Sequence, residues 1–309
     1  MKKIVLTSPS SFGQCGSEPF DLLTKHGFDV INNPFGRRLS EEEVIELARD
    51  CVGIVAGVEP LTARVIDALP NLKCISRVGV GIDNVDIAYT KTKGIAVVNT
   101  PDGPTLPVAE LTLAMTMALL RRIPQAHHNL KNGRWKKEIG NLLYGKTVGV
   151  IGLGRIGRKV AAIFRTLGNL VIGYDLVPDE DWANQNSVTI SSMEKVLKEA
   201  DIITLHIPEN PDKSPVLSKS EFAMMRSSAI LINTARGGVV DEEALYEFLK
   251  NNQIGGAALD VYSKEPYDGC LIELDNIVFT PHLGSYAAEA KLQMEINAVK
   301  NLIDEMEKS

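Results

Sequence analysis

The chain has 309 residues, 44% of them hydrophobic and 23% charged, with a formal net charge of −6 at pH 7. This length accommodates two domains with separate cores, and the acidic balance excludes the basic surface expected of a protein that binds nucleic acid or anionic membranes. The four cysteines, Cys15, Cys51, Cys74 and Cys270, form no CxxC pair, so we expect reduced thiols in the cytoplasm and neither a disulfide framework nor a metal site.

The segments that resemble targeting or membrane signals are too short for those roles. The amino-terminal sequence MKKIVLTSPSS has a basic start but only a short apolar run before Thr7, so we predict a first β-strand there and no secretory signal. The most apolar segment, LPVAELTLAMTMALL at 106–120, contains Glu110 and is shorter than the roughly 20 residues of a membrane span. We therefore predict a buried helix in this segment.

Short β-branched runs alternate with segments of helical period through the amino-terminal third of the chain. Ser40 and Glu43 form a capping box, which predicts the start of one of these helices. Such alternation is typical of parallel α/β architecture. The predicted strands cover residues 3–7, 53–57, 73–76 and 95–98.

A second series of strands starts at residue 146. These strands are apolar throughout, as expected when helices cover both faces of a sheet. They cover residues 146–154, 170–175, 201–208, 229–238, 255–262 and 276–282.

The C-terminal segment has a helical apolar stripe that must pack on another element. We expect this helix to cross back onto the first series, which gives two doubly wound parallel-sheet domains of the α/β class. One domain comprises residues 1–99 plus 285–309, and the other comprises residues 100–284. The stripe consists of Leu292, Ile296, Val299, Ile303 and Met306.

A glycine-rich turn joins the strand and helix in VGVIGLGRIGRKVAAIF. Gly152, Gly154 and Gly157 follow the G-x-G-x-x-G pattern, in which the glycines permit a tight turn, approach of a pyrophosphate and close packing of helix on strand. The first amides of the helix, around Arg155 and Ile156, would then face the phosphates. The sequence predicts a Rossmann-type dinucleotide site.

Asp175 ends the next strand, about 20 residues further on, where a carboxylate binds the adenosine ribose. Its charge would repel a 2′-phosphate, and the LVP sequence that follows supplies no compensating cation. We therefore expect NAD as the cofactor and not NADP.

Three chemically active side chains follow three strand ends of the second series, at the sheet edge where ligands bind. Arg236 can hold a substrate carboxylate and polarise the adjacent carbonyl. His282 can give a proton to the carbonyl oxygen as hydride arrives, and Glu265 can orient that imidazole and raise its pKa. Each residue also has a structural reading, as a helix-capping charge, a turn residue or a solvated acid. Together they predict hydride transfer to a 2-oxo acid.

The motifs GLGRIG, NTARGGVVDEEAL, ALDVYSKEP and TPHLG, in this order, resemble those of the D-isomer-specific 2-hydroxyacid dehydrogenase family. The segments SRVGVGIDNVD and VAELTLAMTMALLR are most similar to its phosphoglycerate dehydrogenase branch. The similarity covers nearly the whole chain and stops where longer relatives add C-terminal regulatory domains. It implies a Rossmann-type NAD domain at 100–284 and a flavodoxin-like substrate domain formed by the rest.

The resemblance also implies roles for individual residues. Arg236, Glu265 and His282 correspond to the family's catalytic residues. The amides of Val78 and Gly79 correspond to a loop that holds the substrate carboxylate, with Arg77 before it as a further substrate contact. Implied cofactor contacts are Val80, Gly152, Gly154, Arg155, Ile156, Gly157, Asp175, Ile207, Ala235, Asp260, His282 and Gly284. Of the remaining histidines, His26, His127 and His128 are expected to be exposed, and His206 is expected to be structural or adjacent to the cofactor.

The substrate tail is left open by the sequence. Arg77, helped by Lys136 or Lys137, can hold the phosphate of 3-phosphoglycerate. Relatives specific for phosphoglycerate often have an arginine at the Ala56 position, however, and Glu59 would repel a dianion if it faced the pocket. Another 2-oxo acid with a neutral or cationic tail, a 2-imino acid, or a corepressor-like NAD-binding protein are the alternatives.

The resemblance further implies a D-hydroxy acid product and a substrate cleft that closes about segments near residues 99 and 284. The helix predicted at 104–121 is very apolar for a monomer's surface, so we expect a homodimer that packs through it, as in the family. No nucleic acid or membrane partner is expected.

Overall fold

The computed structural model describes residues 3–308 and divides into two compact units, Met1–Pro104 with Ser285–Ser309, and Thr105–Gly284. The first break lies after Pro104 and not after residue 99 as predicted. The reason is a pair of hydrogen bonds, since the amide of Thr100 donates to the carbonyl of Gly79 and the amide of Gly79 donates to Oγ1 of Thr100. Residues that follow the last strand of the first unit are thereby attached to it.

The first unit is built on a parallel sheet with the strand order β2-β1-β3-β4-β5. This is the order of flavodoxin-like doubly wound folds. All four predicted strands are present within a residue or two of their expected bounds, and one edge strand, β2, was not predicted. The strands are β1 (Lys3–Thr7), β2 (Phe28–Asn32), β3 (Gly53–Ala56), β4 (Cys74–Arg77) and β5 (Ala96–Asn99).

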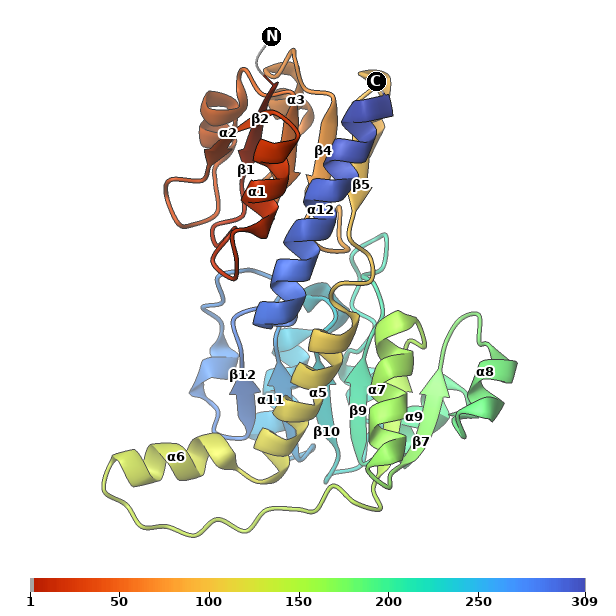
Figure 1. Cartoon of the computed structure of the whole chain (residues 1–309). Coiled ribbons are helices and arrows are strands. Elements are labelled where there is room, and N and C mark those ends of the chain that lie inside the picture. Colours follow the sequence, from red (N-terminus) through yellow and green to blue (C-terminus); the bar gives the residue numbers. More distant parts are fainter. Residues whose placement is uncertain (1–2, 309) are drawn as a thin grey trace. The chain divides into compact units, whose positions relative to one another are not determined.

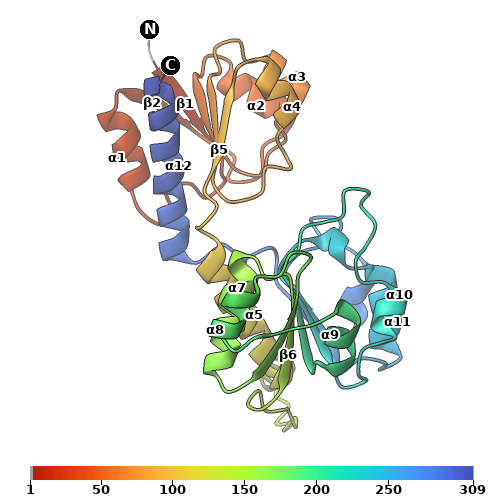
Figure 2. The same ribbon diagram turned by 90° about the vertical axis from the view of Figure 1, so that its right-hand side faces the viewer.

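Helices cover both faces of this sheet, with α1 and α12 on one face and α2, α3 and α4 on the other (Figure 2). The long helix α12 packs on β3, β4 and β5, so its predicted return to the first unit is confirmed. Of the predicted apolar stripe, Val299 and Ile303 are buried and the other three residues are half-buried, while Met294, Ala298 and Leu302 complete the buried face. The capping box of Ser40 and Glu43 at the start of α2 is also confirmed. The helices are α1 (Glu18–Lys25), α2 (Glu41–Ala48), α3 (Ala63–Asp67), α4 (Ile87–Thr92) and α12 (Ala288–Lys308).

The second unit contains a parallel seven-stranded sheet with the order β12-β11-β10-β9-β6-β7-β8. Its chain winds outward from β6 in both directions, which is the Rossmann arrangement and places the topological switch between β6 and β9. The predicted α/β fold class, with two parallel-sheet domains, is confirmed. The strands are β6 (Thr147–Ile151), β7 (Leu170–Tyr174), β8 (Thr189–Ile190), β9 (Ile202–Leu205), β10 (Ile230–Asn233), β11 (Gly256–Leu259) and β12 (Ile277–Phe279).

Two apolar clusters lie on the two faces of this sheet (Figure 2). Helices α5 (Thr105–Leu120), α7 (Arg155–Thr166) and α8 (Glu180–Gln185) cover one face. Helices α9 (Met193–Glu199), α10 (Lys219–Phe222) and α11 (Glu242–Lys250) cover the other. Because α5 lies against α7, β10, β11 and β12, most of its apolar side chains pack within its own unit.

The segment after α5 projects apolar side chains into solvent. Helix α6 (Ile123–Lys131) runs outward from the end of α5, and the extended segment 132–146 returns below the unit before the chain enters β6 (Figure 1). We call residues 123–146 the arm. Among the residues described, no helix is both long and apolar enough to cross a bilayer. The exposed large apolar residues of the arm are Ile123, Leu130, Trp135, Ile139, Leu142 and Tyr144.

Candidate active site

The predicted site residues of the second unit lie where its parallel strands end. Carboxyl ends of parallel strands share one sheet edge, so these side chains gather there. Gly152 follows β6, Asp175 follows β7, Ile207 lies beyond β9, and Asp260 follows β11; Ala235 and Arg236 lie beyond β10, and His282 and Gly284 lie beyond β12.

The glycine turn after β6 has space for nothing larger than hydrogen at two positions. Gly152 has φ +94°, and a Cβ there would lie 2.4 Å from the carbonyl oxygen of His206. A Cβ on Gly157 would lie 1.8 Å from the carbonyl oxygen of Gly152. Gly154, by contrast, faces open space just before α7, so an anion can approach the amino-terminal end of that helix. This cradle fits the pyrophosphate of a dinucleotide.

Asp175 is held at the edge of the same turn. Its Oδ2 accepts a hydrogen bond from the amide of Leu153 (2.7 Å), and its Oδ1 accepts one from the amide of Val177 (3.0 Å). The carboxylate is thereby fixed beside the glycine turn, the position from which such a group binds ribose hydroxyls. The residues present therefore fit NAD.

His282 and Glu265 form a hydrogen-bonded pair beyond β12 and β11. Nδ1 of His282 lies 2.9 Å from Oε2 and 3.1 Å from Oε1 of Glu265. The bond from Glu265 raises the pKa of His282, since a nearby carboxylate stabilises the imidazolium. Burial alone would raise the pKa of Glu265, but the hydrogen bond and charge of His282 outweigh it and leave that pKa below its ordinary value. Because the hydrogen bond to Glu265 involves Nδ1 of His282, Nε2 is the ring nitrogen suited to transfer a proton to a substrate.

Arg236 completes the predicted set. It caps the 3-10 turn Gly237–Val239, and one of its guanidinium nitrogens donates to the carbonyl of Ala235 (2.8 Å). Its charge acts on both His282, where it lowers the pKa, and Glu265. The guanidinium is thus near enough to the pair to interact with both members, and the structure brings the three predicted side chains together.

Asp260, predicted as a cofactor contact, has a structural role that the sequence did not indicate. Its Oδ1 accepts bonds from the Thr280 hydroxyl (2.6 Å) and the Leu283 amide (2.7 Å), and its Oδ2 accepts one from the Gly284 amide (2.8 Å). Burial raises the pKa of this carboxyl despite these donors. The side chain therefore fixes the segment that carries His282.

The predicted substrate loop, residues 77–80, begins at the last residue of β4 in the first unit. Val78 donates its amide to the carbonyl of Ala56 (2.9 Å), and Gly79 donates its amide to Thr100 Oγ1 (2.7 Å). Both amides assigned to a substrate carboxylate thus have a hydrogen-bond partner within the unit. The guanidinium of Arg77 lies against Gly79 and donates to the carbonyl of Val78, and Val80 is exposed.

Glu59 does not present a free carboxylate at the surface. It is only 2% exposed, accepts a hydrogen bond from the Ser8 hydroxyl, and accepts the amide of Gly57 at 3.1 Å on each oxygen. Burial raises its pKa. The predicted repulsion of a dianion depended on Glu59 facing the substrate pocket, and the charge of Arg77, the residue predicted to hold the phosphate, acts on this carboxyl. Of the two lysines considered, Lys136 pairs with Glu138 (2.6 Å).

The other histidines are placed as predicted. His26, His127 and His128 are exposed. Nε2 of His206 lies 2.9 Å from Oγ1 of Thr204, and burial lowers the pKa of the imidazole to about 3, so this histidine is neutral at physiological pH. It is a structural residue behind the glycine turn.

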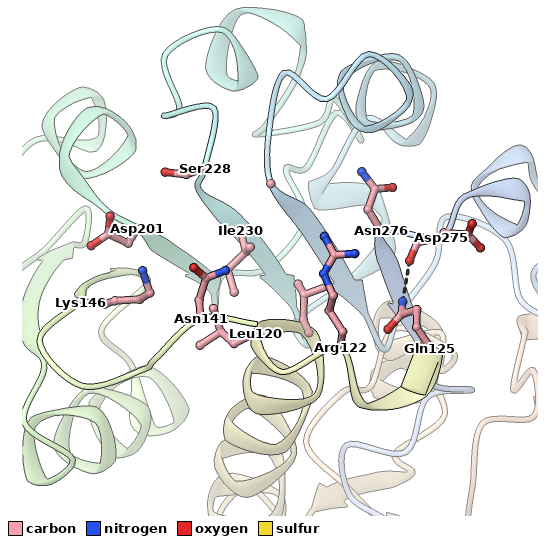
Figure 3. Close-up of a pocket in the computed structure, with 12 residues that line it drawn as sticks. Leu120, Arg122, Gln125, Asn141, Lys146, Asp201, Ser228, Ile230, Asp275 and Asn276 are labelled. Carbon is pink, nitrogen blue, oxygen red and sulfur yellow. Dashed lines mark hydrogen bonds between the residues drawn. The ribbon is translucent and has the colours of Figure 1, made fainter. Parts of the chain in front are cut away.

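A separate cavity of about 250 Å³ lies at the opposite, amino edge of the second sheet (Figure 3). Asp201, Ser228 and Asn276, each from the start of a strand, line it together with Arg122 from the corner between α5 and α6. Gln125 closes one side by donating to the carbonyl of Asp275 (2.5 Å). This cavity is a surface hollow, and it lies far from the carboxyl ends of the strands, where the predicted catalytic residues are. Residues 3–308 contain no cluster of side chains suited to a metal ion.

Comparison with known proteins is consistent with this geometry. Residues 113–284 match the family model of the NAD-binding domain of D-isomer specific 2-hydroxyacid dehydrogenases. The D-3-phosphoglycerate dehydrogenase of Synechocystis sp. is 39% identical over 292 residues, 92% of this chain and 53% of that protein. That of Methanocaldococcus jannaschii is 43% identical over 258 residues, 82% of this chain and 49% of that protein.

Among solved structures, the TT0316 protein from Thermus thermophilus is similar, with a TM-score of 0.90 and 34% identity. The alignment covers 99% of this chain and 97% of that one. The chain thus spans about half the length of the curated relatives it matches and nearly the full length of this structural neighbour.

Proposed function

Because this chain belongs to the D-isomer specific 2-hydroxyacid dehydrogenase family, we propose that it transfers hydride between NAD and a 2-oxo acid, forming the D-2-hydroxy acid. The observation that carries the proposal is the His282–Glu265 pair, with Arg236 near it, at the ligand-binding edge of a Rossmann sheet. We propose 3-phosphoglycerate as the first hydroxy acid to test, since relatives of that activity are about 40% identical.

In this proposal the chain's own residues bind the acid and move one proton. Arg236 holds the carboxylate and polarises the adjacent carbonyl. Nε2 of His282 donates its proton to the carbonyl oxygen during reduction and takes it back during oxidation. Glu265 fixes the imidazole through Nδ1 and stabilises its protonated form. Bound NADH supplies the hydride.

The cofactor would be held by the glycine turn and the strand ends beside it. The first amides of α7 face the pyrophosphate, and Asp175 binds the ribose and disfavours a 2′-phosphate. The pyrophosphate and ribose contacts are proposed from the geometry of the glycine turn, and the remaining cofactor contacts are proposed from the family resemblance. The proposed contacts are Gly152, Gly154, Arg155, Ile156, Gly157, Asp175, Ile207, Ala235, Asp260, His282, Gly284 and Val80.

The amides of Val78 and Gly79 are assigned, with Arg236, to the substrate carboxylate, and Arg77 is assigned to the substrate tail as its cation. Ala56, fully buried in β3, supports the alternative, because the arginine common in phosphoglycerate-specific relatives has no counterpart there. A 2-oxo or 2-imino acid with a neutral or cationic tail is therefore the second candidate.

The test is NADH oxidation across a panel of 2-oxo and 2-imino acids, including 3-phosphohydroxypyruvate, with His282→Asn as the matched variant. We expect turnover by the native chain and a loss of about 10²–10⁴-fold in His282→Asn, the usual contribution of a general acid. NADH affinity, measured by fluorescence titration, should be nearly unchanged. NADH binding without turnover of any acid would overturn the enzymatic proposal in favour of a corepressor-like role.

We also propose that the chain forms a homodimer through the exposed apolar side chains of the arm together with the outer side of α5. The sequence assigned this contact to the helix at 104–121, but α5 is mostly covered by its own unit, so its hydrophobicity alone no longer supports it. A cytoplasmic location remains part of the proposal and is supported by four cysteines without a disulfide bond.

A further inference from the structure

Tyr262 joins the two segments that carry the His282–Glu265 pair. Its hydroxyl donates to the carbonyl oxygens of Thr280 (2.8 Å) and Leu259 (3.0 Å). Its amide donates to Oε1 of Glu265 (3.3 Å). Thr280 lies two residues before His282, so a single residue contacts Glu265 directly and reaches the backbone next to His282 through its phenol.

The ring of Tyr262 is fixed independently of its hydroxyl. It stacks on Tyr267, with ring centroids 4.6 Å apart and planes inclined by 25°, and it lies 6.4 Å from the ring of Phe279. Offset aromatic contacts of this kind hold a side chain in one rotamer. Loss of the hydroxyl alone would therefore leave the ring in place and remove only the bonds between the segments.

We propose that the Tyr262 hydroxyl is a positioning group, which ties the end of β12 to the end of β11 and so sets the distance between His282 Nδ1 and the Glu265 carboxylate. The inference rests on the proposed function for its kinetic consequence, but the geometry that it concerns can be measured without turnover. Tyr262 itself touches neither the imidazole nor a reacting atom in this scheme.

The groups that act electrostatically on His282 come from two strand ends. Glu265 and Asp260, beyond β11, raise the pKa of its imidazole, and Arg236, beyond β10, lowers it. Asp260 is held separately by Thr280, Leu283 and Gly284. If the Tyr262 bond is removed, the Glu265 contact loosens while the opposing guanidinium charge stays. The imidazolium then loses its proton at lower pH.

The experiment compares Tyr262→Phe with Tyr246→Phe in the full chain. Tyr246 is a matched control because its hydroxyl bonds only to Glu273 and Lys250, both on the surface away from the pair. Histidine side chains are labelled, and the His282 resonance is assigned by its disappearance in His282→Asn. The pH titration of that resonance then reports the pair directly, whether or not the chain turns over any acid.

We expect the His282 titration to move to lower pH in Tyr262→Phe and to stay in place in Tyr246→Phe. Where turnover is found, kcat for reduction should fall about fivefold in Tyr262→Phe with KM for NADH unchanged, as expected from the loss of one orienting hydrogen bond. A lowered melting temperature with an unmoved His282 titration would mean that the hydroxyl serves stability alone, and would overturn the inference.

Discussion

His282 lies in the left-handed region, with φ +56°, a conformation that a residue other than glycine adopts at a cost of roughly 1–2 kcal/mol. The surrounding bonds hold it there. Its amide donates to the backbone carbonyl of Asp260 (2.9 Å), while the side chain of Asp260 holds the next two amides. A strained backbone that several hydrogen bonds hold in place is typical of functional positions, because it fixes where a side chain points.

Glu265→Gln tests whether the carboxylate sets the protonation of His282. The folded-state pKa of His282 is raised by Glu265, so its proton is retained to higher pH than in a free imidazole. Reduction needs the protonated form. Removing the carboxylate should therefore move the alkaline limb of the kcat/KM profile for reduction to lower pH and lower kcat near neutral pH by about tenfold, since both groups are partly exposed.

The reverse reaction supplies the control for this variant. Oxidation needs neutral His282, so its acidic limb should also move to lower pH in Glu265→Gln. If both limbs coincide with those of the native chain, the 2.9 Å contact has no part in proton transfer.

That Arg236, Glu265 and His282 gather at one sheet edge was predictable from sequence because each follows a strand end in a recognisable motif. The hydrogen-bond partners of individual donors could not be predicted from the sequence. Whether the amide of Gly79 is free depends on Thr100, which is distant in the chain, and the direction of Glu59 depends on Ser8. Such pairings are set by the tertiary fold, and no local pattern encodes them.

Among the elements, the buried strands were predictable, and two edge strands, β2 and β8, were not. β3, β9 and β10 are buried at every residue, so their apolar runs stand out. β2 is an edge strand with the sequence FDVIN and mixed exposure, and β8 has only two residues. A strand that pairs on one side alone carries a weak hydrophobic signal.

Two variants of the glycine turn are expected to affect the stability of the fold and the affinity for NADH differently. Gly157→Ala places a methyl group on the carbonyl oxygen of Gly152, so the α7 start must move away from β6. We expect a loss of about 1–3 kcal/mol in the free energy of unfolding. We also expect at least a tenfold loss of NADH affinity, measured by urea unfolding and fluorescence titration respectively.

Gly154→Ala is the matched variant for this turn. Its backbone has φ −73°, and an added methyl group meets nothing within 4 Å, so the free energy of unfolding should stay within about 1 kcal/mol of the native value. The methyl group would still stand where a pyrophosphate approaches, so NADH affinity should fall. Equal losses of stability in the two variants would contradict this division of roles.

At the scale of the whole molecule, the distribution of exposed apolar side chains indicates which surface would pack on another chain. α5 was expected to be that surface, but it is packed on three strands and on α7. In the arm, Trp135 is 82% exposed and Ile139 is 92% exposed. The amide of Asn141 donates to the carbonyl of Leu120 (2.8 Å), so the arm is anchored to the unit at its return. An anchored segment that presents large apolar side chains is suited to pack on a second copy.

Ile139→Glu tests the proposed homodimer. A carboxylate at the centre of an apolar contact would be desolvated without a partner, which costs several kcal/mol per ion, and a two-fold axis would place the change on both copies. We expect sedimentation velocity at micromolar concentration to give a dimer for the native chain and a monomer for this variant. Phe35→Glu, which alters an exposed apolar residue of the first unit, is the control and should remain dimeric. A native chain that sediments as a monomer would leave the exposed arm without the proposed partner, and an Ile139→Glu dimer would place the contact elsewhere on the chain. The control excludes a general effect of added charge, because both variants change the net charge by the same amount.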